Sequence, residues 1–472
     1  MVALCVGALL AVPAAPGAGL VPATGWIPNS LVMPPFPNVA TSPARVTWLH
    51  PTRRIVPQEG VPGRFLMGHA LYGLWQSVPG VGWTSLTPQC LSIVGPLLTR
   101  PVLPVLPGCG VEGIAFDEAT TPRRPLAVYV STFDIDLLAP GTPIAPGGIY
   151  KAELPIGQRD ISTAGLTWRP LLTGVRGNAI LVKRSGSGPA TIVAGRIQRD
   201  GGNVGTDVNT WCAAGGDCSP SVYVSHDDGQ TWGVRSFAGS PCSAAVGTSS
   251  RLVGGLDYDR NSPNVIYAAA NSGLWVSKDN GATWSYAFYS CGNSPGFAVT
   301  KRTPAGAGRV YVGKNEAGAN TSGIWWAPAN ANGAGTFAQL TLQHAVTRTP
   351  MTLSGWTQSI LIDARDPSER TLYVAAWRDA NSNGGGGLGG IYKVVDQGNG
   401  IALVTDLLAS FLEPARDCFG HSPNCLNNLN SPWPLIFHPL WRPSLFLAQH
   451  PLVPDLLYAS SVYGGVWTKS DG

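Results

Sequence analysis

The sequence predicts an all-β protein, a seven-bladed β-propeller of four-stranded blades. Three observations predict this fold class: a short motif that recurs along the chain, a second motif that precedes it, and an aromatic residue that follows it. The 59 glycines and 41 prolines suit a protein with many turns. No segment shows the apolar periodicity of a helix.

The first motif is a glycine followed by an aliphatic and an aromatic residue. Its shortest spacings, about 50 residues, match one propeller blade of four strands. The longer spacings predict loop insertions within or between blades. The copies are Gly73–Trp75, Gly148–Tyr150, Gly273–Trp275, Gly323–Trp325, Gly390–Tyr392 and Gly465–Trp467, with Ser221–Tyr223 filling the one gap.

The second motif is an aliphatic residue, a tyrosine and a small or β-branched residue, as at Val128–Val130 and Ile266–Ala268. Short β-branched and aromatic runs between turn residues are strand signals. The third element is an aromatic residue beyond the glycine motif, as at Trp83 and Trp168. Each unit is therefore predicted to contain a strand, a hairpin turn, a second strand, a further turn and a third strand.

Two eight-residue segments, Ser225–Trp232 and Ser277–Trp284, both fit the pattern Ser-x-Asp-x-Gly-x-Thr-Trp. Here the sequence resembles the Asp-box, or BNR-repeat, propellers, which include sialidases, sortilin-like receptors and xyloglucan-degrading glycosidases. An Asp carboxylate can accept backbone N–H bonds within its own turn, and glycine permits a positive φ. We therefore expect Asp-box hairpins with a structural role for these residues: Ser225, Asp227, Gly229, Thr231, Trp232, Ser277, Asp279, Gly281, Thr283 and Trp284.

The predicted domain organisation has three parts. Residues 1–19 resemble a signal-peptide leader, residues 20–40 a linker, and residues 41–472 the propeller. Residues 45–49, which contain Trp48, are expected to close the ring as the outer strand of the last blade, since closure removes exposed sheet edges. Insertion loops are expected at residues 84–112, 131–147, 196–220, 376–389 and 407–445.

Composition and cysteine usage favour a secreted or cell-envelope protein. Eight of the nine cysteines follow the leader, and an even number fits disulfide bonds, with 90–109, 212–218 and 418–425 as neighbours that would close short loops. Neither cysteine nor histidine spacing indicates a metal site, and no cofactor motif is present. The net charge of +4 is spread thinly, which argues against nucleic-acid binding. No later apolar run is long enough for a stable membrane span.

Catalytic residues are harder to predict than the fold. Asp117, Asp259 and Asp363 recur in equivalent places before the tyrosine strands, so we interpret them as turn residues. Asp257 breaks this repeat and is the weak catalytic candidate. The sialidase family carries an Arg-Ile/Leu-Pro motif, whereas Arg54–Pro57 has one residue too many. The Gly-x-Ser-x-Gly match around Ser294 lacks the strand-to-helix context of a nucleophile elbow.

Two functions are consistent with this sequence. The first is a secreted Asp-box propeller that binds an extracellular glycan or protein through its insertion loops, with Trp211, Trp377 and Trp433 available to stack on sugar rings. The alternative is a secreted glycoside hydrolase, xyloglucanase- or sialidase-like, with a carboxylate pair in the propeller cleft. Fold alone does not choose between an enzyme and a binding module.

Overall fold

The structure is a computed structural model. It describes residues 27–28, 52–58, 61, 64–69, 73–78, 82–87, 110–117, 125–133, 147–158, 160–161, 166–175, 177–184, 186–196, 220–237, 253–290, 294–302, 308–314, 321–330, 333–354, 356–377, 390–407, 447–450, 455–461 and 465–470. These residues form strands and turns and no α-helix. The described part of the chain therefore holds no helix of the length and hydrophobicity that crossing a bilayer requires.

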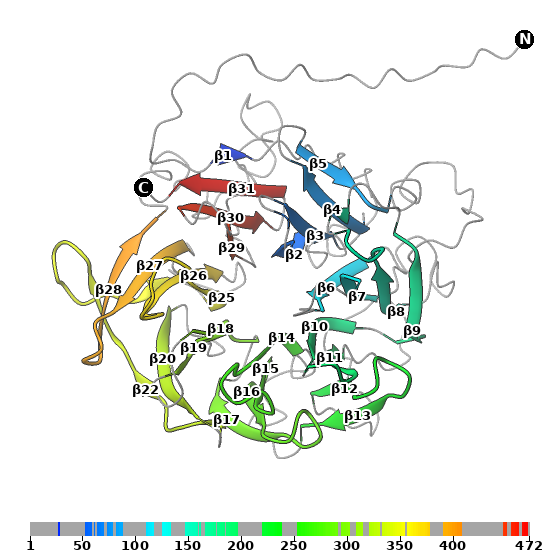
Figure 1. Ribbon diagram of the computed structural model, residues 1–472. Helices are drawn as coiled ribbons and strands as arrows, with labels where there is room; N and C mark the ends of the chain where they lie inside the picture. The colour runs from blue at the N-terminus through cyan, green and yellow to red at the C-terminus, as the bar shows by residue number, and fades with distance from the viewer. Residues whose placement is uncertain are drawn as a thin grey trace, which may run out of the picture.

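Four antiparallel sheets each contain four strands that follow one another in the chain, from the centre of the molecule outward (Figure 1). Their strands are β2 (Thr52–Pro57), β3 (Phe65–His69), β4 (Gly73–Val78) and β5 (Gly82–Ser85); β6 (Gly110–Phe116), β7 (Ala127–Phe133), β8 (Gly148–Glu153) and β9 (Trp168–Thr173); β10 (Gly177–Arg184), β11 (Ala190–Arg196), β12 (Ser221–Ser225) and β13 (Gly233–Ser236); and β14 (Val253–Tyr258), β15 (Ile266–Ala270), β16 (Gly273–Ser277) and β17 (Ser285–Tyr289).

Two further sheets carry additional strands. The first contains β18 (Phe297–Val299), β19 (Arg309–Lys314) and β20 (Thr321–Asn330), with the short strands β21 (Gly333–Ala334), β22 (Ala338–Gln339) and β24 (Leu353–Ser354) paired to β20. The second contains β25 (Trp356–Ile362), β26 (Thr371–Trp377), β27 (Gly390–Asp396) and β28 (Ile401–Asp406), with β23 (Thr341–His344) added in parallel at its outer edge.

The remaining sheet joins the two ends of the described chain. It contains β29 (Leu447–Gln449), β30 (Leu456–Ser461), β31 (Gly465–Ser470) and β1 (Ile27–Pro28). β1 pairs with β31 in antiparallel register, Ile27 opposite Thr468 and Pro28 opposite Trp467. Two residues of the expected linker thus occupy the outer position, while residues 45–49, which we predicted for that place, lie outside the described residues.

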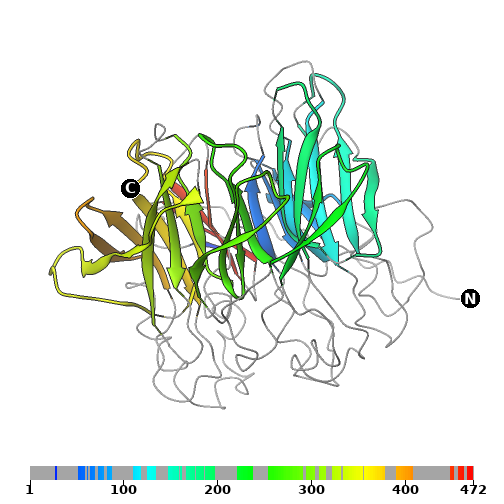
Figure 2. The same cartoon turned by 90° about the horizontal axis from the view of Figure 1, so that it is seen from below.

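The seven sheets surround a common axis. Each innermost strand contacts the innermost strand of the next sheet, in the closed order β2, β6, β10, β14, β18, β25, β29 and back to β2. Figure 2 shows the strands running along this axis, and Figure 1 shows the innermost strands gathered around it. The predicted all-β propeller fold is therefore confirmed, and the glycine motif, or Ser221–Tyr223 in its place, lies in the third strand of each sheet, as at Gly148 and Gly390.

A position in the second strand of every sheet holds a small residue. It pairs with the aliphatic residue of the glycine motif, as Gly195 does with Val222. A Cβ built on Gly195 would lie 2.6 Å from the carbonyl oxygen of Val253, and one on Gly313 would lie 2.2 Å from the Cβ of Thr357. Both partners sit at a β-bulge in the next innermost strand. The seven small residues are Gly68, Ser131, Gly195, Ala269, Gly313, Ala375 and Ser460.

The hydrophobic core is divided into clusters that lie between neighbouring sheets. One cluster joins Val193 and Val224 to Ile266 and Trp275 of the next sheet. Trp275 is fully buried and stacks on Phe237 at a centroid distance of 5.0 Å. Because every described cluster spans two sheets, burial of apolar area stabilises the ring as a whole rather than single blades.

Candidate functional site

A buried polar residue lies at the end of the innermost strand of every sheet, directly after the strand in six sheets and one residue before its end, at Lys183, in the seventh. In each sheet, one residue of the innermost strand pairs with the second-strand tyrosine or with the residue at the equivalent position. The polar residue comes two positions later in the chain: Ala115 pairs with Tyr129, for example, and Asp117 follows two residues after Ala115. All seven side chains are at most 9% exposed. We call them the polar ring: Gln58, Asp117, Lys183, Asp259, Thr300, Asp363 and His450. The recurrent Asp positions noted in the sequence thus belong to a larger set whose polar groups vary.

Asp363 has partners on both carboxylate oxygens. Arg365 donates from Nε at 3.0 and 3.1 Å and from Nη2 at 2.7 Å, the Tyr373 hydroxyl donates at 3.1 Å, and Gln449 of the next sheet donates at 2.8 Å. Arg365 also bonds the Tyr373 hydroxyl and pairs with Asp455. Burial alone would raise the pKa of Asp363, but the hydrogen bonds from Arg365 and Gln449 outweigh it and lower the pKa. We call these residues the Asp363 cluster.

Asp117 is held on one oxygen only. Its Oδ2 accepts bonds of 2.8 Å from Nε and Nη2 of Arg184, which ends β10 of the next sheet. Arg184 also pairs with Asp228 and donates to the Gly188 carbonyl oxygen at 2.6 Å. Burial would lower the pKa of Arg184, yet the bonds to Asp117 and Asp228 raise it above its usual range. Within the described residues, Asp117 Oδ1 has no hydrogen-bond partner.

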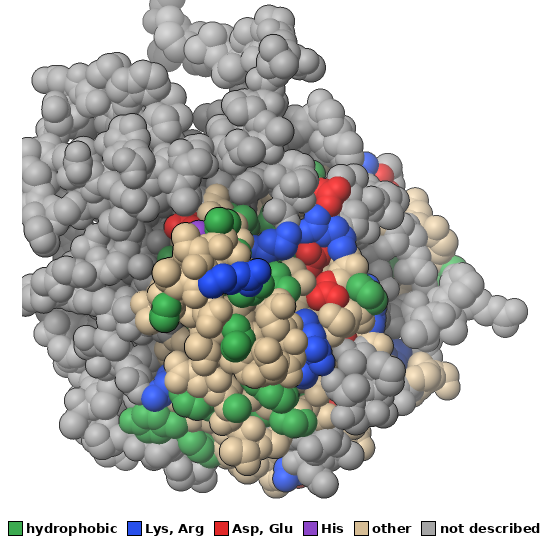
Figure 3. Space-filling view, turned by 90° about the vertical axis from the view of Figure 1, so that its left-hand side faces the viewer, with side chains coloured by type: hydrophobic (Ala, Val, Ile, Leu, Met, Phe, Trp, Pro, Cys, Tyr) green, Lys and Arg blue, Asp and Glu red, His purple; other side chains and the backbone are tan. Residues whose placement is uncertain are grey.

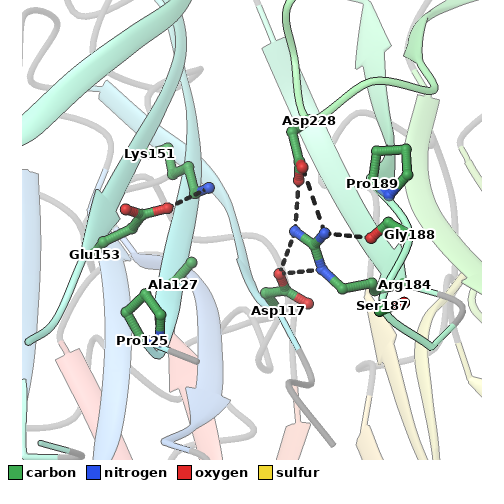
Figure 4. A pocket seen from close by; sticks show the side chains of 10 residues that line it. All are labelled: Asp117, Pro125, Ala127, Lys151, Glu153, Arg184, Ser187, Gly188, Pro189 and Asp228. Carbon is green, nitrogen blue, oxygen red and sulfur yellow. Dashed lines mark hydrogen bonds and ion pairs between the residues drawn. The ribbon is translucent and has the colours of Figure 1, made fainter. Parts of the chain in front are cut away.

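A pocket of about 490 Å³ opens beside Asp117, between the sheet β6–β9 and the sheet β10–β13. Figure 4 shows Lys151 and Glu153 of β8 on one side, and Asp117, Arg184 and Asp228 on the other. Lys151 pairs with Glu153, and its Nζ lies 5.4 Å from the centre of the Tyr129 ring. We call these residues, together with Tyr129, the Asp117 cluster. It is the candidate functional site, because it combines a cavity with several convergent charged groups.

Tyr129 pairs across strands with the pocket residue Lys151, and its hydroxyl is buried. Among the described residues that hydroxyl also has no hydrogen-bond partner. Burial, followed by the charge of the Asp117 carboxylate, raises the pKa of Tyr129 above its usual value, so the phenol stays neutral. The Tyr129 hydroxyl and Asp117 Oδ1 are thus two buried polar groups for which the described residues provide no hydrogen bond to offset the loss of water.

Lys183 places a cation at the polar-ring position of the neighbouring sheet. Its Nζ donates to the Pro263 carbonyl oxygen and lies 5.8 Å from the centre of the Tyr258 ring. Burial lowers the pKa of Lys183 to about 8. Asp117, Lys183 and Asp363 of the polar ring therefore connect adjacent sheets by different chemistry.

Asp257, the weak catalytic candidate, lies in β14 rather than in the pocket. Its Oδ2 is 3.4 Å from Lys301 Nζ and its Oδ1 accepts the backbone N–H of Tyr258 at 2.9 Å. The neighbouring Asp259 accepts the N–H of Asn261 within its own turn at 2.8 Å. The structure thus does not bring Asp257 together with Asp117 or Asp363, each of which ends the innermost strand of a different sheet. The catalytic role of Asp257 stays a prediction.

The two Asp-box segments form the turns β12–β13 and β16–β17. In the first, Asp227 Oδ1 accepts the N–H of Gln230 at 3.0 Å and that of Thr231 at 2.9 Å, and Ser225 Oγ accepts the N–H of Gly229 at 2.9 Å. The side-chain and backbone bonds from Thr231 lower the pKa of Asp227 to about 2. The Trp232 indole donates to the Leu171 carbonyl oxygen of the preceding sheet at 3.2 Å.

The second segment repeats this geometry. Asp279 accepts the N–H of Thr283 at 2.8 Å, and Ser277 accepts the N–H of Gly281 at 2.7 Å. Burial would raise the pKa of Asp279, but the bonds from Thr283 and Ser277 outweigh it and lower the pKa. The Trp284 indole donates to the Gly281 carbonyl oxygen at 3.1 Å and its ring packs 4.9 Å from Phe237.

Several predicted features lie outside the described residues: the leader, all nine cysteines, Trp211 and Trp433. For Trp377 the structure describes only the backbone, in β26. The Arg54–Pro57 segment belongs to the innermost strand β2. Ser294 donates to the Ala269 carbonyl oxygen at 2.8 Å. Among the described His, Asp and Glu side chains no group suited to a metal ion comes together.

Sequence reasoning missed Lys151, Glu153 and Arg184, which supply three of the charged side chains of the pocket. The signal for Lys151 was visible, because Lys151 and Lys393 follow the aromatic residue of the glycine motif in two units. On the face shown in Figure 3, some of the described basic side chains lie beside acidic ones, others lie apart, and together they form no continuous basic stripe.

No family model matches the chain, and no curated protein matches its sequence. Solved structures, in contrast, are similar to it in fold. An ancestral GH74 enzyme is similar with a TM-score of 0.51 and 13% identity, covering 89% of this chain and 45% of its own. The GH74 xyloglucanase from Xanthomonas campestris gives a TM-score of 0.50 and 15% identity, covering 88% of this chain and 51% of its own. The shared feature is the propeller fold. The propeller thus spans about half the length of these two enzymes.

Proposed function

We propose that this chain is the Asp-box propeller of a secreted protein and that it binds an extracellular glycan or protein without cleaving it. The observation that supports this is the state of the carboxylates around the pocket. Asp117 and Asp228 share Arg184, and Glu153 pairs with Lys151. A glycosidase needs a carboxylic acid that donates a proton, whereas each of these carboxylates lies against a cationic side chain.

The insertion loops are the proposed ligand contact. The strands that flank all five insertions end at the face opposite the polar ring: β7 ends at Phe133 and β8 begins at Gly148, for example. The loops themselves, with their cysteines and proposed disulfides, lie outside the described residues. Loops on a rigid scaffold commonly carry recognition, so clustering of their attachment points on one face supports a binding surface there.

The second candidate is a secreted glycoside hydrolase of the xyloglucanase or sialidase type. Likeness to two GH74 enzymes favours it, at an identity that supports the fold alone. Asp257 is its candidate catalytic residue in the described residues.

Incubation of the purified chain with a panel of glycans, xyloglucan included, tests the proposal. We expect retention of a ligand on an affinity gel or glycan array with no release of reducing sugar. A boiled sample is the control for adventitious adsorption. Release of sugar that disappears in an Asp257→Asn variant would support the hydrolase and contradict the binding role.

A further inference from the structure

The Asp117 and Asp363 clusters occupy equivalent places in two sheets. Ala115 pairs with Tyr129 as Leu361 pairs with Tyr373. On the other side, Tyr129 pairs with Lys151 just as Tyr373 pairs with Lys393. The lysine Nζ lies 5.4 Å from the tyrosine ring centre in the first cluster and 5.9 Å in the second. The aspartate, tyrosine and lysine of the two clusters therefore correspond residue by residue.

The Asp363 cluster contains a guanidinium from its own turn, and the described residues of the Asp117 cluster contain none from theirs, of which residues 118–124 lie outside the description. Arg365, two residues after Asp363, bonds both Asp363 oxygens and the Tyr373 hydroxyl. The residue two after Asp117 is Ala119, which has no donor in its side chain. Correspondingly, Asp117 Oδ1 and the Tyr129 hydroxyl lack partners among the described residues, although Asp117 is only 4% exposed.

The charge of the pocket matches a cationic group. Three carboxylates line it, from Asp117, Glu153 and Asp228, against the two cations Lys151 and Arg184. One negative charge is therefore left over when all five groups are ionised. Glu153 is half exposed and reachable from solvent, whereas Asp117 lies at depth. An incoming cation would meet Glu153 first and Asp117 last.

We propose that this pocket binds the guanidinium group of an arginine side chain presented by a polypeptide partner. A planar guanidinium offers five donors in a fixed fork and pairs with carboxylates in two-bond geometry, which a lysine ammonium does not. Arg365 shows that the same arrangement of aspartate, tyrosine and lysine holds such a group. The site goes beyond the proposed ligand contact at the insertion loops, because it lies at the opposite ends of the strands.

The probe is a short capped peptide with one central arginine, followed by saturation-transfer NMR or calorimetry with the full chain. The matched probe replaces arginine by citrulline, which keeps the shape and removes the charge. We expect binding of the arginine peptide and at least about tenfold weaker binding of the citrulline peptide, as the loss of a charged hydrogen bond implies. Equal binding of the two peptides, or tighter binding of a glucosamine oligomer, would overturn the proposal.

Two variants test the location. Glu153→Gln is expected to weaken arginine-peptide binding about tenfold. The charge-matched control is Asp455→Asn, which removes one exposed carboxylate from the Asp363 cluster and should leave binding unchanged. Ala119→Arg copies Arg365, so it should abolish peptide binding while the melting temperature is kept or raised. Retained binding in Ala119→Arg with a normal melting temperature would place the peptide elsewhere.

Arg123 and Arg124, close to the pocket residue Pro125 in sequence, provide a second check. If the wild-type chain ignores the arginine peptide and an Arg123→Ala/Arg124→Ala variant acquires binding, the chain fills its own pocket and the proposal is wrong. Glycan retention without peptide binding in the wild type and in this variant would also overturn it while leaving the proposed function intact.

Discussion

The Asp117 and Asp363 clusters are two versions of one local design. Each has a buried aspartate at the end of an innermost strand, a buried tyrosine beside it and a lysine over the tyrosine ring. In the Asp363 cluster an arginine from the same turn satisfies the aspartate and the tyrosine. A pocket opens beside Asp117, and the residues that follow Asp117 in its turn lie outside the described residues. The comparison teaches that the same aspartate can pair with a guanidinium from its own turn, as Asp363 does with Arg365, or with one from the next sheet, as Asp117 does with Arg184.

Removal of the aspartate is expected to give the largest difference in stability between the two clusters. Asp363→Ala leaves the Gln449 amide and one edge of the Arg365 guanidinium without their hydrogen-bond acceptor. We therefore expect the free energy of unfolding to fall by about 3 kcal/mol. Asp117→Ala should cost less, about 1–2 kcal/mol, since Arg184 keeps Asp228 and the Gly188 carbonyl oxygen as partners. Urea denaturation of both variants measures the difference. Equal losses would show that the two clusters are energetically the same.

Removal of the arginine should turn the closed cluster into the open one. Arg365→Ala takes donors from Asp363 and the Tyr373 hydroxyl, and we expect a loss of about 2 kcal/mol. Millimolar methylguanidinium should then raise the melting temperature of the variant more than that of the wild type, because a ligand that binds only the folded state stabilises it. Methylurea, which is neutral, is the control. The same response to both compounds would contradict the equivalence.

A smaller effect is expected on the stability at low pH, through Asp366. Burial would raise the pKa of Asp366, yet the hydrogen bonds from Ser368 and Thr371 in the turn after Asp363 lower it to about 2. A depressed pKa contributes stability that is present above the ordinary value of 3.8 and is lost as the pH falls through about 2. Asp366→Asn should therefore cost about 1 kcal/mol at pH 6 and progressively less toward pH 2, measured by urea denaturation at each pH. A loss that stays constant over this range would argue against the assignment.

The smallest effect is expected at Asp257, which occupies the place of Ala115 and Leu361 in its own sheet. Its pairing with Lys301 is solvent-exposed on the lysine side, and such pairs contribute at most about 1 kcal/mol. Asp257→Leu should therefore change the free energy of unfolding by less than about 1 kcal/mol. A large loss in thermal or urea denaturation would show that Asp257 is structurally required.

The fold could be predicted from the sequence because the tyrosine and glycine motifs mark adjacent strands whose residues pair with one another. The small residue two after the tyrosine, as at Gly313, was an available signal that only the close approach to Thr357 explains. The polar ring was recognised only where it holds aspartate. Lys183 and His450 hold the same position with unrelated side chains, and spacing alone does not reveal that they are equivalent.

The pocket could not be predicted, because it is made by residues of two sheets that meet only in the closed ring. Lys151 belongs to β8 of one sheet, and Arg184 and Asp228 belong to the next sheet. Nothing local distinguishes Ala119 from an ordinary loop residue until Arg365 is seen to fill the equivalent place. The strand that pairs with β31 was also unexpected, since Ile27–Pro28 has no recurring motif.

The pairing of β1 with β31 has a mechanical consequence. The two strands are antiparallel, so the chain enters β1 at the same end of the ladder at which it leaves β31. Tension applied through these two ends would load the ladder bonds one after another, as in a zipper, rather than all together in shear. Stretching in an optical trap should accordingly open the ring at this sheet first and at low force.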